Sequence, residues 1–325
     1  MNIYLNMEIK VMKFGGDSLA TPKNQDIVKN IVSSSKEKII LVCSAMGRDG
    51  FPYSTASLLK LIDENNVSNK ELDRLISVGE IISSIRLSCV LNSNKIKSYA
   101  LSINEMGIKC DNSYTDGNVV SLDNKKINEL IKKYKVIIVP GFIGLSNENE
   151  IITLGRGNSD LTSVLMAKLF SLDKVYLYKN VDGVFHTAPN VYRQFKIFNF
   201  ISYDEMLALV DIGFGIVSKK AIIESKKNKI ILQINNYQTN IVGTIISSKA
   251  SGDLILGFNI IDKLVKVATF NVKKVRDIIT NSLEKKHIFV KNETIKNSEY
   301  SFEISKSMVN LVKNILLDVI NEHNK

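Results

Sequence analysis

The chain has 325 residues, 45% of them hydrophobic, and a formal net charge of +10. This length predicts one large α/β domain followed by a smaller one. No apolar run reaches the roughly 18 to 20 residues that span a bilayer, and the N-terminus has no signal-peptide pattern, so we expect a cytoplasmic protein without membrane partners. The basic residues are dispersed, which argues against nucleic-acid binding, and the spacing of the three cysteines predicts free thiols.

The first strong pattern is an apolar strand, residues 7–14, that delivers Lys13 and then breaks at Gly15 and Gly16. Glycines let a backbone approach a bound anion closely, and the lysine ammonium can reach the same anion. The pattern therefore fits a phosphate loop, although a simple tight turn has the same residues. A helix over 22–33 and a buried strand over 38–43 follow.

The second strand ends in small residues, Ser44 to Gly47, at the sheet edge where parallel α/β sheets bind ligands. After a polar loop and a helix from about residue 57, residues 71–91 have helical periodicity that Gly79 and Glu80 interrupt. A glycine inside a helix suggests that something approaches the helix backbone there. Glu80 is either an ordinary surface glutamate or a carboxylate directed at a substrate ammonium.

A third strand over 135–140 precedes TLGRGNSD at 153–160. Glycines flank Arg156, Asn158 and Ser159 can cap the helix that follows, and Asp160 lies in its first turn. An arginine before a helix N-terminus suits an anionic ligand, but an ordinary cap with an incidental arginine is the alternative.

The remaining pattern alternates strands and helices. A strand over 174–178 leads into a turn at 180–185, and Ser202 with Glu205 predicts a capping box for a helix over 201–217. A strand over 229–235 completes the large domain. From about residue 254, a strand, helix, strand, strand and helix predict a small α+β module.

Six ordered motifs resemble the aspartokinases of the amino acid kinase family. They are KFGGDS at 13–18, VCSAMGRDGFPYST at 42–55, SVGEIISS at 77–84, TLGRGNSD at 153–160, NVDGVF at 180–185 and ISYDEM at 201–206. The resemblance implies the amino acid kinase fold, an open and mostly parallel sheet between helix layers, over residues 1–248. It also implies an ACT-like regulatory or dimerisation module over 249–325, and a homodimer.

The same resemblance implies transfer of the γ-phosphoryl group of ATP, with Mg²⁺, to the side-chain carboxylate of L-aspartate. Lys13 would contact the transferred group and Asp160 would orient that lysine, with no metal held by side chains alone. The substrate residues it implies are Ser44, Thr55, Glu80, Arg156 and Ser159. The nucleotide residues it implies are Lys13, Gly15, Gly16, Ser18, Lys179, Asn180, Asp182, Gly183 and Phe185.

Several positions depart from the family pattern, all in the nucleotide half. They are Asp17, Lys179, Asn180, Ala188, Asn190 and Gly215. Gly215 stands where the family has a lysine, so Lys179, Lys219 or Lys220 would have to supply the missing charge. The alternative is a non-catalytic homologue that senses an amino acid or partners an active kinase. Retention of Lys13, Glu80, Arg156 and Asp160 together favours the enzyme.

Overall fold

The structure, a computed structural model, describes residues 8–188, 191 and 195–324. The described chain divides into two compact units. The first contains residues up to Asp182 together with Ile223–Val242, and the second contains Gly183–Ile222 together with the chain from Gly243 onward. The predicted domain boundary after residue 248 stays a prediction.

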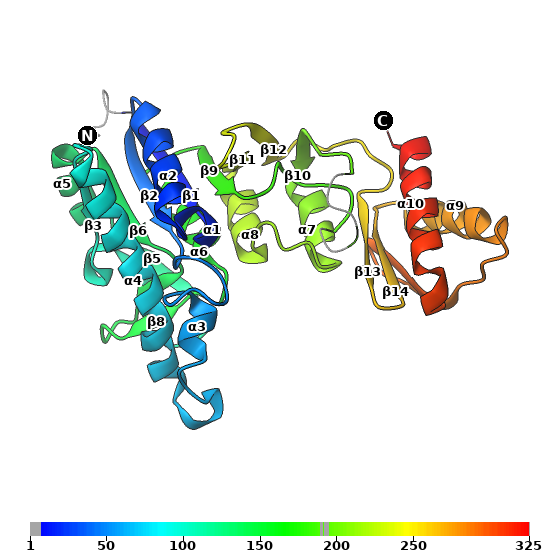
Figure 1. The fold of residues 1–325 in the computed structure, drawn as a ribbon, viewed down its shortest axis with the longest axis horizontal. Coiled ribbons are helices and arrows are strands. Elements are labelled where there is room, and N and C mark those ends of the chain that lie inside the picture. The colour runs from blue at the N-terminus through cyan, green and yellow to red at the C-terminus, as the bar shows by residue number, and fades with distance from the viewer. Residues whose placement is uncertain (1–7, 189–190, 192–194, 325) are drawn as a thin grey trace. The chain divides into compact units, whose positions relative to one another are not determined.

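A parallel sheet forms the centre of the first unit (blue to yellow in Figure 1). Six strands lie side by side in the order β11-β9-β1-β2-β6-β3, and every neighbouring pair is parallel. Their bounds are β1 Ile9–Phe14, β2 Lys38–Cys43, β3 Ser98–Ala100, β6 Val136–Pro140, β9 Lys174–Lys179 and β11 Ile231–Asn236. The apolar runs of β2 and β6 are buried throughout the strand interior, as expected for strands covered on both faces.

Helices cover both faces of this sheet. On one face α2 (Pro22–Ser34) and α4 (Asn69–Ser93) pack against Met12, Phe14 and their neighbours. On the other face α6 (Ser159–Leu169) packs against β1, β2 and β9, and α5 (Lys125–Lys133) packs against β6. The predicted open sheet between helix layers is therefore confirmed.

The helix α4 is continuous across Gly79. A Cβ at Gly79 would lie 2.7 Å from the Tyr53 carbonyl oxygen and 2.8 Å from the Ala45 Cβ, which confirms a close approach to the helix backbone there. By length and composition alone α4 could also span a membrane. Its buried residues include Asp73 and Glu80 and pack within the unit, as in the core helix of a globular domain.

A second, smaller sheet of the first unit was not predicted. Its order is β5-β4-β7-β8, with bounds β4 Ile108–Cys110, β5 Val119–Leu122, β7 Ile143–Leu145 and β8 Ile151–Thr153. These strands have only three or four residues each, too few for the alternation of polar and apolar residues to show clearly. Strand β8 leads directly into the glycine-flanked turn that precedes α6.

The second unit combines a parallel pair with the C-terminal module. Strand β10 (Phe200–Ser202) pairs with β12 (Val242–Ser247), and α7 (Tyr203–Asp211) follows β10 with the predicted capping box of Ser202 and Glu205. The helix ends at Asp211 and not at Val217, because Gly213 adopts a φ of +106° that a helix cannot continue through. Helix α8 (Lys219–Asn228) begins in this unit.

The C-terminal module has one more strand than predicted. Its antiparallel sheet has the order β13-β14-β16-β15, and α9 and α10 pack against it. The bounds are β13 Gly257–Ile261, β14 Leu264–Ala268, α9 Val272–Glu284, β15 Lys291–Ile295, β16 Glu299–Glu303 and α10 Val309–His323. The sequence analysis missed β13, so the chain order is ββαββα and not βαββα.

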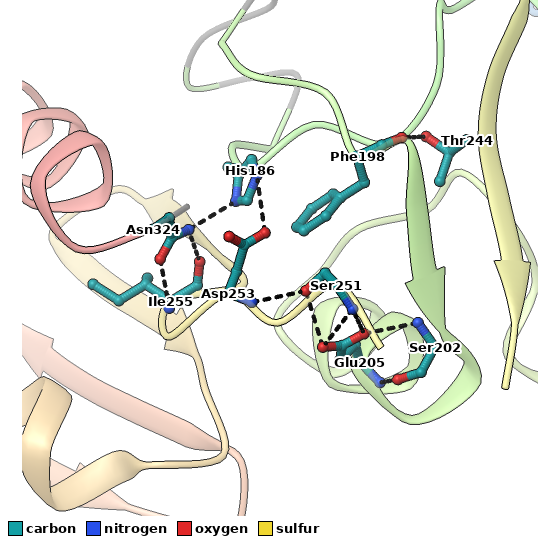
Figure 2. Close-up of polar contacts among 9 residues, drawn as sticks. All are labelled: His186, Phe198, Ser202, Glu205, Thr244, Ser251, Asp253, Ile255 and Asn324. Atoms are coloured by element: carbon teal, nitrogen blue, oxygen red, sulfur yellow. Dashed lines mark hydrogen bonds and ion pairs between the residues drawn. The ribbon is translucent and has the colours of Figure 1, made fainter. Parts of the chain in front are cut away.

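Figure 2 shows how the second unit is held together around the segment that enters the module. The Asn324 amide accepts a hydrogen bond from the Ile255 N–H (3.0 Å) and donates one to the Ile255 carbonyl (2.6 Å). Glu205, besides capping α7, accepts hydrogen bonds from the Ser251 N–H and hydroxyl. The His186 ring contacts the Phe198 ring in a tilted arrangement, with centroids 3.9 Å apart, and lies 3.7 Å from the Asp253 carboxylate. Burial lowers the pKa of His186 to about 4.

We expect Asn324→Ala to loosen this segment. Losing both hydrogen bonds should cost about 1–3 kcal/mol, because the Ile255 N–H is left without its partner. Hydrogen–deuterium exchange of the peptide around Ile255 should accelerate, whereas Asn321→Ala, on the exposed surface of α10, should leave it unchanged. Equal exchange in the two variants would contradict this role of Asn324.

Candidate active site

Two lysines reach the same face of the parallel sheet. Strands β1 and β9 pair so that Lys13 lies opposite Leu177, and side chains alternate along a strand, so Lys179 points to the same face as Lys13. Their neighbours Phe14 and Tyr178 point to the opposite face, where the two rings stack with centroids 4.5 Å apart. Both lysines therefore lie on the face that α6 covers.

Asp160, in the first turn of α6, binds both lysines. Its carboxylate lies 2.9 Å from the Lys13 Nζ and accepts hydrogen bonds of 2.9 and 2.8 Å from the Lys179 Nζ. The side chains of Lys13, Asp160 and Lys179 are 6%, 4% and 15% exposed. The structure thus brings together the predicted pair Lys13 and Asp160 and adds Lys179 as a second cation.

The ionisation of this cluster follows from its geometry. Burial alone would raise the pKa of Asp160, but the charges of Lys13 and Lys179 outweigh it and lower the pKa to about 2. Burial lowers the pKa of Lys179 to about 8; Asp160 opposes this shift, and the charge of Lys13 adds to it. At neutral pH the carboxylate is therefore ionised, and Lys179 is protonated but releases its proton readily.

The turn before α6 depends on glycine. Gly155 and Gly157 adopt φ values of +95° and +78°, which side chains other than glycine rarely allow. Asn158 occupies the N-cap position, but its side chain donates a hydrogen bond back to the Leu154 carbonyl. The predicted capping by the Asn158 side chain is therefore wrong, because that amide closes the turn instead.

Ser44 and Ser159 meet on the same face of the sheet. The Ser44 hydroxyl, at the end of β2, donates a hydrogen bond of 3.0 Å to the Ser159 hydroxyl at the start of α6. A Cβ at Gly141, just after β6, would lie 2.6 Å from the Ser159 Cβ. The ends of β2 and β6 and the start of α6 thus converge, as the predicted substrate roles of the two serines require.

Glu80 is a buried carboxyl with one free oxygen. Its Oε1 accepts a hydrogen bond of 2.9 Å from the Ala45 N–H, and its Oε2 is buried with no hydrogen-bond partner. Burial raises the pKa of Glu80 to about 8, although the Ala45 hydrogen bond and the charge of Lys13 oppose the shift. The surface-glutamate alternative is therefore wrong, and Glu80 holds a proton at neutral pH.

The phosphate-loop candidate is fixed against the turn after β2. The Gly47 N–H donates to the Gly16 carbonyl at 2.9 Å, and a Cβ at Gly16 would lie 2.4 Å from the Gly47 carbonyl oxygen. No side chain fits at Gly16. Gly15 approaches the lysine, since its Cβ position lies 3.9 Å from the Lys13 Nζ, and Ser18 donates to the Gly15 carbonyl at 2.6 Å.

Asp17 has two partners at this loop. Its carboxylate accepts hydrogen bonds from the Arg48 Nε (2.7 Å) and from the Asn180 side-chain amide (2.6 Å). The added negative charge that the sequence places beside the loop is therefore neutralised by Arg48. Asn180 connects the end of β9 to the loop after β1.

Arg156 and Thr55 lie at the periphery. Arg156 is exposed and forms an ion pair with Glu64, which lies in the short helix Glu64–Asn66. Thr55 is the first residue of α3 (Thr55–Leu59), which the Ser54 side chain caps. The structure gives neither residue a contact with Glu80, so their substrate roles stay predictions, and Arg156 must leave Glu64 to bind a substrate carboxylate.

The remaining nucleotide candidates are divided between the units. Asp182, in the first unit, accepts a hydrogen bond of 2.7 Å from the Asn236 amide. Gly183 and Phe185 belong to the second unit, where Phe185 bridges to Ile197. Ala188 is buried in that unit, a Cβ at Gly215 would contact nothing within 4 Å, and Asn190 lies outside the described residues.

The sequence analysis missed Asp73. This fully buried carboxylate on α4 accepts hydrogen bonds from the N–H groups of Thr115 and Thr153 and from the Thr153 hydroxyl (2.6 Å). It fixes the start of the turn that carries Arg156. In the sequence Asp73 stands between Leu72 and Arg74, so its immediate neighbours gave no signal that it is buried.

The comparisons place the fold in a family. The model of the amino acid kinase family matches residues 8–236. The chain belongs to the amino acid kinase family. It is 30% identical over 276 residues to an aspartokinase of Geobacillus stearothermophilus, covering 82% of this chain and 67% of that protein. It is 29% identical over 272 residues to aspartokinase 2 of Bacillus subtilis, covering 82% and 66%.

An aspartokinase of Helicobacter pylori is 31% identical over 241 residues, covering 73% of this chain and 58% of that protein. This amino acid kinase thus spans about two thirds or less of the length of these relatives. Among solved structures, the aspartate kinase of Clostridium acetobutylicum aligns with a TM-score of 0.71 at 18% identity, covering 97% of this chain and 100% of that one. A uridylate kinase of Archaeoglobus fulgidus aligns at 0.51 and 17%, covering 74% of this chain and 100% of that one, which supports the fold alone.

We expect Glu80→Gln to change how stability depends on pH. The Glu80 carboxyl keeps its proton up to about pH 8 in the fold but loses it near 4.5 when unfolded. The folded chain therefore binds more protons between these values, and its stability falls as pH rises, by at most about 1.4 kcal/mol per pH unit.

Denaturant titrations at pH 5 and pH 8 should show the wild type losing stability relative to Glu80→Gln. Glu129→Gln, exposed on α5, should follow the wild type at both pH values. A constant difference between the wild type and Glu80→Gln would mean that Glu80 is ionised throughout this range.

Proposed function

We propose that the chain is an aspartate kinase that transfers the γ-phosphoryl group of ATP to the side-chain carboxylate of L-aspartate. The observation that carries the proposal is the buried cluster of Lys13, Asp160 and Lys179 beside a glycine loop, together with the unpartnered oxygen of Glu80. The aspartokinases to which the chain is similar support this choice of acceptor.

The chemistry requires charge neutralisation more than proton transfer. An oxygen of the aspartate side-chain carboxylate attacks the γ-phosphorus, the bond from that phosphorus to the β–γ bridging oxygen breaks, and ADP leaves. A carboxylate is already a nucleophile, so no base has to remove a proton. Lys13 would lie against the transferred group, where its charge favours the spread of negative charge in the transition state.

The acceptor would be held at its amino-acid end. Its ammonium would meet the free Oε2 of Glu80, which would then give up its proton, because a neighbouring positive charge favours the carboxylate. Its α-carboxylate would pair with Arg156 after this side chain leaves Glu64. Ser44 and Ser159 supply hydroxyls between these groups and the lysine cluster.

Mg²⁺ would arrive with the nucleotide. In the described part of the chain, no group of three or more His, Cys, Asp or Glu side chains could hold a metal ion. Mg²⁺ commonly keeps several waters and binds substrate phosphates with one or two carboxylates, so a phosphate-bound ion fits this site. The homodimer, the cytoplasmic location and a regulatory role of the C-terminal module stay predictions.

Purified chain with ATP, Mg²⁺ and L-aspartate should form an acyl phosphate that hydroxylamine traps as aspartyl hydroxamate. Lys13→Ala should lower the rate at least about a hundredfold, because it removes the buried cation nearest the glycine loop. Absence of hydroxamate from the wild type with every nucleoside triphosphate tested would overturn the proposed activity and favour the non-catalytic homologue.

Arg156→Ala should weaken aspartate binding selectively. Loss of a charged hydrogen bond to the α-carboxylate, worth about 1.5–3 kcal/mol, should raise the KM for aspartate by roughly ten- to a hundredfold and leave the KM for ATP within about twofold. Arg276→Ala is the matched control, because Arg276 is also an exposed arginine paired with a glutamate. A rise in the KM for ATP alone would show that the assignment of Arg156 is wrong.

A further inference from the structure

We propose that Lys179 is a second phosphate-binding lysine of this site and contacts the same anionic group as Lys13. This inference rests on the proposed function for the identity of the anion, a transferred phosphoryl group. The sequence left Lys179, Lys219 and Lys220 as candidates for the positive charge that Gly215 cannot supply. The position of Lys179 in the first unit favours this lysine.

Lys179 lies beside Lys13 in the sheet. Lys179 ends β9, the direct neighbour of β1, and the strand register directs both lysines to one face at the same end of the sheet. Both ammoniums lie within 3 Å of the Asp160 carboxylate. The two ammoniums therefore lie close together, and one anion can contact both.

The lysine cluster carries an excess positive charge. One lysine neutralises Asp160, so the second leaves the cluster with a net charge of +1 in a site that is largely closed to water. The groups around it do not cancel this charge. Asp17 is paired with Arg48, and Glu80 holds its proton at neutral pH. A buried cation without a counter-charge is costly, and a bound anion removes this cost.

Lys219, another of the three candidate lysines, has a different environment from Lys179. Lys219 is about half exposed and pairs with Asp211 in the second unit, so its charge is already matched. Lys179 shares its partner with Lys13. Because the pKa of Lys179 is lowered, a bound anion should stabilise the protonated form of this lysine.

Binding of inorganic tripolyphosphate, measured by calorimetry without metal or acceptor, tests the proposal. Lys179→Met should weaken binding at least tenfold, and Lys179→Arg, which keeps the charge, should restore most of it. Lys174→Met is the matched control, since Lys174 is a half-buried lysine at the opposite end of the same strand, and its binding should equal that of the wild type. Wild-type affinity in Lys179→Met would overturn the proposal.

A second measurement covers the case in which Lys179→Met does not fold. Between pH 7.5 and 9.5 the affinity of the wild type should fall relative to that of Lys179→Arg, by up to about tenfold per pH unit above 8, because only the lysine can lose its charge. A constant ratio would mean that Lys179 keeps its charge up to pH 9.5, and wild-type affinity in Lys179→Gln would then overturn the proposal.

The kinetic consequence separates the two proposals. In the hydroxamate assay Lys179→Met should lower kcat at least tenfold. The KM for aspartate should change less than kcat. If the wild type makes no hydroxamate, the proposed function fails while the tripolyphosphate measurements still decide the role of Lys179. If the wild type is active and Lys179→Met retains its kcat, only the role of Lys179 fails.

Discussion

The shared ion pair of Asp160 with Lys13 and Lys179 is the interaction on which the site depends. It joins three elements, the strands β1 and β9 and the start of α6, at one end of the parallel sheet. The two lysines lie on the same face of the sheet, because parallel pairing sets Lys13 opposite Leu177 and side chains alternate along a strand. The same pairing places the stacked Phe14 and Tyr178 on the opposite face, where they belong to the core.

Around this cluster, backbone contacts set positions that side chains alone could not hold. The loop after β1 and the turn after β2 touch at Gly16 and Gly47, and α4 approaches the same turn at Gly79. The close approach at Gly79 brings Glu80 under the Ala45 amide, which binds one carboxyl oxygen and leaves the other free. The helix glycine and the buried acid are thus two parts of one arrangement.

Much of this could be predicted from the sequence. Continuous apolar runs indicated the long central strands, and Ser202 with Glu205 indicated the start of α7. Short strands such as β8 and β13 could not be predicted, because pairing with a neighbouring strand defines them and their few residues show no clear periodicity. The pair Lys13 and Asp160 was predicted by resemblance, but the contact of Asp160 with Lys179 needed the register of β9, and the buried Asp73 looked like an ordinary helix residue.

The hydrogen bond between Asn180 and Asp17 has a consequence for how such a site can evolve. Here the acid stands at 17, and an amide faces it from 180. A second acid at 180 would set two carboxylates against each other. Substitutions that move the acid from one position to the other therefore have a preferred order, in which one acid is lost before the other is gained.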